Sequence, residues 1–385
     1  MTPHSGIFIR PDQAFLNSTR RIEVMKGRLL QIANFFKELP IVFAPGALVL
    51  LTAVSSYPQE IHPAEIDSLL QNSIRATINQ NYAHALAEID QVIARAPESP
   101  LGHLFRAATL QAIMLDYEDD REEKEFYKSL KNCRTRAEKL LRQQPNSAWA
   151  HFYLGSAQGY ESFYVSKHRR YFQAFQLGLK SIHHLETAVQ LDPKLYDAQL
   201  GIGTYKYYRS KLSNKLPVPL FSDERAAGIA MVRQTIAHGK YARYAAINAL
   251  TWILLDEGKP AEAFALADSA LQEFPNSRFF LWGAGESAVR LGEFQRAQDY
   301  YRHIMTTLQQ ENKLSSYLEA VCRTKIAKVS FLGGQIETGC QELATARQLE
   351  VPHDDWHKDI KKDIATLASQ CAKSPAAANG HSTSH

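Results

Sequence analysis

The chain has 385 residues, of which 45% are hydrophobic, and its formal net charge at pH 7 is +4. This hydrophobic content supports a large buried core, which excludes an intrinsically disordered protein. Residues 1–55 carry six Lys/Arg and three Asp/Glu, so the rest of the chain has a net charge of only +1. That near-neutral balance excludes the broadly basic surface that binds nucleic acid.

The first expected element is an export signal within residues 1–55. A basic stretch that starts at Met25 (MKGRLL) precedes the uncharged run PIVFAPGALVLLTAVSS, which is shorter than the ~20 residues of a membrane-spanning helix. Ala53-Val54-Ser55 provides small residues for cleavage, so we expect Met25 as the true start and a mature chain from near residue 56. A membrane anchor that is never cut and a buried core helix are the alternatives. A lipoprotein anchor is not supported, because no Cys follows the run.

The next elements are helices separated by regularly spaced prolines. Four segments, RAPESP, RQQPNS, QLDPKL and EFPNSR, each end one apolar helical run and begin another, at Pro97, Pro145, Pro193 and Pro275. The spacings are 48, 48 and 82 residues. Because 82 is 48 plus 34, we expect a further boundary near residue 241, where HGKYARY interrupts the pattern. The longer units predict elongated helices, since fourteen extra residues amount to about four helical turns.

The small residues of the later units support a repeat. Gly258 lies at one expected inter-helix turn, before an alanine face at 263, 267 and 270, and Gly292 lies at the next. With the 34-residue spacing, this pattern resembles the tetratricopeptide repeat over roughly residues 65–350, and the longer pattern is similar to uncharacterised bacterial exported proteins of that family. The resemblance implies an all-α fold, a right-handed superhelical solenoid of antiparallel helix pairs, here about seven.

This reading divides the chain into four expected segments. They are the export region 1–55, the repeat array 56–350, a capping helix at 351–373 and a disordered tail at 374–385. One Pro-rich segment at 209–223 interrupts the array and contains LPVPLF, which is too apolar to remain wholly in water. A lip over a binding groove and simple packing on a neighbouring helix are its two interpretations.

The Gly-x-Gly at residues 201–203 raises the question of a nucleotide-binding site. A phosphate-binding loop needs a strand directly before its glycines, but here the preceding residues have a helical period through Ile182, Leu185 and Val189. We therefore expect a packing role, in which glycines 155, 203 and 285 let the second helix of each pair approach the first.

Cysteines and histidines give no recognisable reactive site. Cysteines 133, 322, 340 and 371 lack Cys-x-x-Cys spacing, and we expect all four to be unpaired, since 322 and 340 are offset along their helices. His183 and His184 point to different faces of one helix. His353 and His357 either hold a metal or belong to a helix start that Asp354 or Asp355 caps, and we favour the cap. We predict no catalytic, cofactor or metal residues, and no enzyme.

The expected binding site is a groove lined by the first helix of each pair. Residues one turn from the packing glycines face it, and such an aromatic groove suits a peptide or partner protein. Trp149, Phe152, Tyr160 and Phe279 also meet the spacing, although for Trp149 and Phe279 we favour a role in the seam between units. The predicted groove residues are Tyr207, Tyr208, Asn248, Trp252, Asp256, Trp282, Glu286 and Arg290.

These features predict a non-enzymatic protein-binding scaffold of the bacterial envelope or periplasm. The expected partner is a protein or peptide, with no nucleic acid and no integral membrane span in the mature chain, while peripheral membrane association is possible. The alternatives are an outer-membrane assembly factor that acts in a complex, and an enzyme or ligand-binding protein built on a solenoid.

Overall fold

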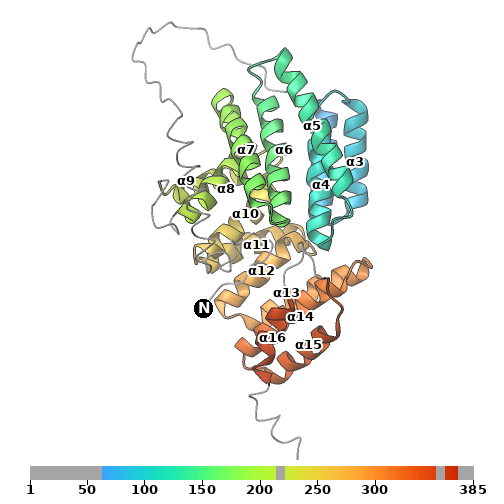
Figure 1. Cartoon of the computed structure of the whole chain (residues 1–385), viewed down its shortest axis with the longest axis vertical. Helices are drawn as coiled ribbons and strands as arrows, with labels where there is room; N and C mark the ends of the chain where they lie inside the picture. Colours follow the sequence, from blue (N-terminus) through green and yellow to red (C-terminus); the bar gives the residue numbers. More distant parts are fainter. Residues whose placement is uncertain (1–62, 214–221, 353–359, 372–385) are drawn as a thin grey trace, which may run out of the picture.

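The computed structural model describes residues 63–213, 222–352 and 360–371, and within these ranges it is built from helices without strands. Figure 1 shows the helices following one another in chain order from the blue to the red end of the molecule. Seven antiparallel pairs precede one last helix: α2 (Ala64–Ile78) with α3 (Tyr82–Arg95), α4 (Leu101–Tyr117) with α5 (Glu123–Gln143), α6 (Ala148–Lys167) with α7 (Tyr171–Leu191), α8 (Tyr196–Ser213) with α9 (Arg225–His238), α10 (Arg243–Asp256) with α11 (Pro260–Glu273), α12 (Arg278–Leu291) with α13 (Phe294–Gln310), α14 (Ser316–Leu332) with α15 (Ile336–Gln348), and then α16 (Ile360–Ala368).

The pairs stack into a solenoid with two layers. The first helices of successive pairs contact one another, as α4 with α6, α6 with α8, α8 with α10 and α10 with α12. Each second helix packs on its own first helix and on the next pair. A pair therefore leaves an apolar face that only its neighbour covers, which confirms the expected all-α solenoid of antiparallel helix pairs.

The helix boundaries follow from the turn residues in the sequence. All four proline segments lie between helices, and residues 239–242 separate α9 from α10, which confirms the boundary expected near 241. Gly258 and Gly292 end their helices with φ of 73° and 78°, a conformation that a side chain disfavours. Helices α5, α6 and α7 have 20 or 21 residues against 14 in α10, α11 and α12, as the longer units predicted.

The segment at 209–223 is only partly an interruption. Helix α8 continues to Ser213, so its first residues are helical, and α9 begins at Arg225. Glu224, directly before α9, joins the end of α8 to the start of α9, since it pairs with Lys206 and Arg209 of α8. Residues 214–221 lie outside the described ranges, so the lip over a groove stays a prediction.

The array folds back, because the first pair packs against the fifth and sixth pairs. Ser277 donates to the carbonyl of Ile78 (2.6 Å), and the Arg278 amide donates to Gln80 Oε1 (3.2 Å). Tyr241 donates to Asp67 of α2 from the turn before α10. Ile78 accordingly belongs to the apolar core of the second half of the array, and Tyr241 to that of the first.

The cysteine expectation was wrong for two of the four residues. Cys340 of α15 and Cys371 form a disulfide, with their Cα atoms 5.7 Å apart. Helix α16 returns to pack on α14 and α15, which carries Cys371 back to Cys340, a contact that the offset of Cys322 from Cys340 does not indicate. Cys133 and Cys322 are free and buried, and burial raises the pKa of each thiol to about 12.

No helix in the described ranges is both long and apolar enough to cross a bilayer. The expected export signal in residues 1–55, the pair His353 and His357, and the tail at 374–385 lie outside those ranges.

Candidate functional site

The candidate site is the surface of the inner layer over α8, α10, α12 and α14, which we call the inner face. Side chains three or four residues apart share one side of a helix, so each helix contributes a short row to this face. The half-buried members provide mostly polar groups above an apolar base. They are Tyr208, Asn248, Asp256, Arg290 and Lys325.

Tyr207 does not lie on this face. Its side chain is fully buried, and its hydroxyl lies 2.6 Å from Asp256 Oδ2 and 2.9 Å from Glu257 Oε1, to which it donates. Burial and the two carboxylates raise the pKa of Tyr207, so the hydroxyl stays a donor. Tyr207 thus links α8 to the end of α10. This corrects the prediction that Tyr207 contacts a partner directly.

The two predicted groove tryptophans lie in the seams between units. Trp252 is 8% exposed and Trp282 is 7% exposed, and both belong to the apolar core. The ring centre of Trp282 lies 6.0 Å from that of Tyr301 and 6.0 Å from Lys325 Nζ. Only a small part of each indole reaches solvent, so these residues support the inner face from below. This corrects the expectation that Trp252 and Trp282 line the groove and contact the partner.

Charged side chains form a strip across the same units. Glu286 is 7% exposed and lies between two cations, 3.3 Å from Arg290 Nε and 3.7 Å from Lys325 Nζ. Arg290 also donates to the carbonyl of Leu255, where it satisfies the carboxyl end of α10. One carboxylate with two cations leaves a net charge of +1, so the strip favours an acidic or carbonyl-bearing ligand group.

A second polar group lies at the α8 end of the face. Asp256 accepts from Tyr207 and pairs with Lys211, while Glu257 pairs with Arg225 at 3.1 Å. Tyr208 packs its ring edge-on to Tyr207, with centroids 5.1 Å apart. These pairs hold the ends of α8 and α10 in register.

Of the other four predicted aromatics, Trp149, Phe152 and Tyr160 support the first half of the array and Phe279 the second half. Trp149 and Phe152 are each 6% exposed, and Trp149 packs on Tyr241, so the seam interpretation of Trp149 fits its position. Phe279 is partly buried against the core. Tyr160 is half-buried, and burial raises its pKa to about 12.

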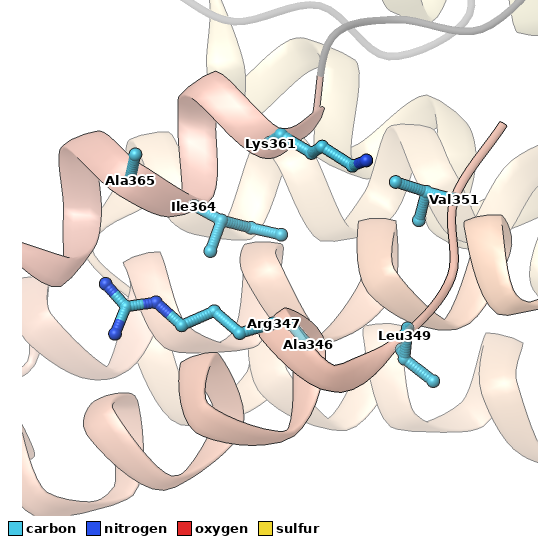
Figure 2. A pocket seen from close by; sticks show the side chains of 7 residues that line it. All are labelled: Ala346, Arg347, Leu349, Val351, Lys361, Ile364 and Ala365. Carbon is cyan, nitrogen blue, oxygen red and sulfur yellow. The ribbon is translucent and has the colours of Figure 1, made fainter. Parts of the chain in front are cut away.

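A hollow of about 170 Å³ lies between α15 and α16. Figure 2 shows Ile364 at its centre, with the charged ends of Arg347 and Lys361 well apart and directed to different sides. Cations that do not converge offer no defined anion site. Among the described residues no group of three His, Cys, Asp or Glu side chains is arranged to hold a metal.

Two features of the site were missed from sequence. Lys325, which completes the charged strip, lies one unit beyond the last groove residue, and extending the repeat to α14 would have indicated it. Lys211 belongs to the segment at 209–223, which the sequence predicts to interrupt the array, whereas the structure places Lys211 in helix α8. Only the omission of Lys211 follows from a misplaced helix boundary.

Comparisons with known proteins give matches only among solved structures. No family model and no curated protein matches the sequence. Among solved structures, PilW, described as a widely conserved type IV pilus biogenesis factor, is 12% identical over 68% of this chain and 97% of its own, with a TM-score of 0.44. A tetratricopeptide repeat protein from Parabacteroides merdae is 12% identical over 80% and 99% (TM-score 0.35), and yeast Tom70 is 13% identical over 94% and 77% (TM-score 0.39).

TM-scores this low support no inference about function, and the fold assignment does not depend on them. The stacked antiparallel helix pairs, with their inner and outer layers, carry the assignment. In fold, the chain is a tetratricopeptide-like helical-repeat protein.

Proposed function

We propose that the chain is a non-enzymatic protein-binding scaffold of the bacterial cell envelope, and that a peptide or protein segment binds its inner face. The observation that supports this most is the inner face itself, where polar groups from four consecutive units lie on a buried aromatic base. Tyr208, Asn248, Asp256 and Arg290 remain its proposed contact residues, now joined by Lys325, while the buried Glu286 holds Arg290 and Lys325 in place. Trp252 and Trp282 hold the face in shape.

Two observations support the envelope. The Cys340–Cys371 bridge suits an oxidising compartment, where such bonds persist. The apolar run before residue 56 has the composition of an export signal. An assembly factor held at the outer membrane by other proteins is a narrower form of the same proposal, and it would place the chain in a stable complex.

Affinity purification from a bacterial envelope fraction, followed by native mass spectrometry, tests the proposal. We expect a protein partner in a fixed ratio, with less of it on Asn248→Arg than on the matched control Ser269→Arg, because Ser269 is exposed on the outer helix α11. A retained small organic molecule without any protein would instead indicate a ligand-binding protein or an enzyme.

A further inference from the structure

A pair of histidines lies in contact across α6 and α7, away from the inner-face residues described above. His151 Nδ1 and His184 Nδ1 are 3.0 Å apart, and the ring centroids are 5.2 Å apart. His183 lies beside them, with its ring centroid 5.6 Å from that of His184, and its side chain is exposed. The two Nδ1 atoms therefore come from different helices and lie within hydrogen-bonding distance of each other.

The helix packing fixes this contact. Gly155 lies one turn after His151, and a Cβ atom there would be 2.9 Å from the Ser181 carbonyl oxygen and 2.7 Å from Leu185 Cγ. Ser181 donates to the Gly155 carbonyl at 2.7 Å. The backbones of α6 and α7 are thus held at close range where the two imidazoles meet.

The spacing of the two nitrogens matches the bite of a metal chelate. Metal–nitrogen bonds of about 2.0–2.1 Å place two cis ligands about 2.9 Å apart at a right angle and about 3.3 Å apart in a tetrahedron. The observed 3.0 Å lies between these values. To bind one ion, each ring would turn so that its Nδ1 lone pair points to the ion instead of along the line between the two nitrogens.

The protonation state also suits metal binding. Burial lowers the pKa of His151 and lowers that of His184 to about 4, with the neighbouring histidines adding to both effects. The neutral ring is the form in which imidazole binds a metal. Without a metal, one Nδ1 donates its hydrogen to the other, and a shift of that hydrogen to Nε2 frees both lone pairs.

We propose that His151 and His184 chelate one divalent first-row transition-metal ion, such as Zn²⁺, Ni²⁺ or Cu²⁺. Two protein ligands leave further coordination positions for water or for a donor atom from a partner. Cu²⁺ binds most tightly in the general order of such ions, whereas the hard oxygen-seeking ions Mg²⁺ and Ca²⁺ do not bind. The bound ion ties α6 to α7.

Calorimetric titration of the full-length, tag-free chain with Zn²⁺ or Ni²⁺ tests this proposal. We expect one strong site per chain, weakened at least about tenfold in His151→Asn and in His184→Asn. The matched control is His183→Asn, which removes the adjacent exposed imidazole and should change the affinity less than twofold. No binding by the wild type, or equal losses in all three variants, would overturn the proposal.

A second measurement needs no variant. Zn²⁺ should protect His151 and His184 of the wild-type chain from diethylpyrocarbonate, as followed by peptide mass spectrometry. Protection of other histidines with these two labelled as before would place the ion elsewhere and refute the assignment.

Discussion

Arg278 and Asp116, which lie 162 residues apart in sequence, form a two-pronged ion pair with distances of 2.9 and 2.6 Å. The guanidinium group also donates to both carboxylate oxygens of Glu311 at 2.8 Å, and only 1% of Arg278 is exposed. Tyr82 donates to Asp116 and Tyr117 to Glu311. This network fastens the second pair of helices to the sixth and so holds the fold-back closed.

Removing one member of this network should lower the stability of the protein. Arg278→Met leaves two carboxylates facing each other without their cation, and we expect a loss of about 3–5 kcal/mol in the free energy of unfolding. Arg296→Met is the matched control, because this arginine is half-exposed in its ion pairs with Asp268 and Glu293 and should matter by at most about 1 kcal/mol. Urea denaturation measures both, and equal losses would argue against the closed fold-back.

The glycine contact between α8 and α9 gives a second prediction. A Cβ atom on Gly203 would lie 2.6 Å from the Gly228 carbonyl oxygen, and backbone cannot move aside as a side chain can. We expect Gly203→Ala to destabilise the protein by more than 1 kcal/mol. Gly178→Ala is the control, since its nearest neighbour would be at 3.5 Å and alanine gains about 0.5–1 kcal/mol in a helix. Thermal melts should shift in opposite directions, and a shared direction would contradict the packing role.

Thiol titration tests the disulfide. The unreduced chain should show no reactive thiol when native, because Cys133 and Cys322 are buried, and two when denatured. Reduction should raise the denatured count to four, and Cys340→Ser should lower stability by about 2–4 kcal/mol, as a loop of 31 residues implies. Four thiols without reduction would restore the expectation drawn from sequence.

Trp252 distinguishes support of the inner face from contact with a partner. Since this side chain is 8% exposed, we expect Trp252→Ala to cost about 3–5 kcal/mol of stability. Asn248→Ala lies one turn earlier on the same helix and should cost less than about 1 kcal/mol. A stable Trp252→Ala protein that loses its partner would return Trp252 to the contact surface.

Much of this fold could be predicted from sequence, because its signals are local. Prolines between helices and glycines at close contacts act within one helix pair, so the repeat and the long helices of the first half could be read from spacing. The fold-back could not, since Arg278 and Asp116 belong to different units and no local pattern relates them. The Cys340–Cys371 bridge likewise depends on how α16 returns to the array.

The exposure of the predicted groove residues could not be read from the sequence. Spacing from the packing glycines selected residues of α8, α10 and α12, yet residues one turn apart on a helix can lie in a seam or on the surface according to how the next unit packs. Tyr207 and Trp252 are buried for this reason, while Tyr208 and Asn248 remain partly exposed. Long-range neighbours such as Lys325 decide the charge of the face.

The most direct test of the scaffold function is site-specific photocrosslinking in intact cells. A photoreactive residue at position 248 or 208 should form an adduct with one protein partner, and the same residue at position 269, on the outer layer, should not. Mass spectrometry of the adducts should locate the partner segment against the inner face. Adducts at position 269 alone, or none at 248 and 208 while the partner still copurifies, would contradict binding at this face.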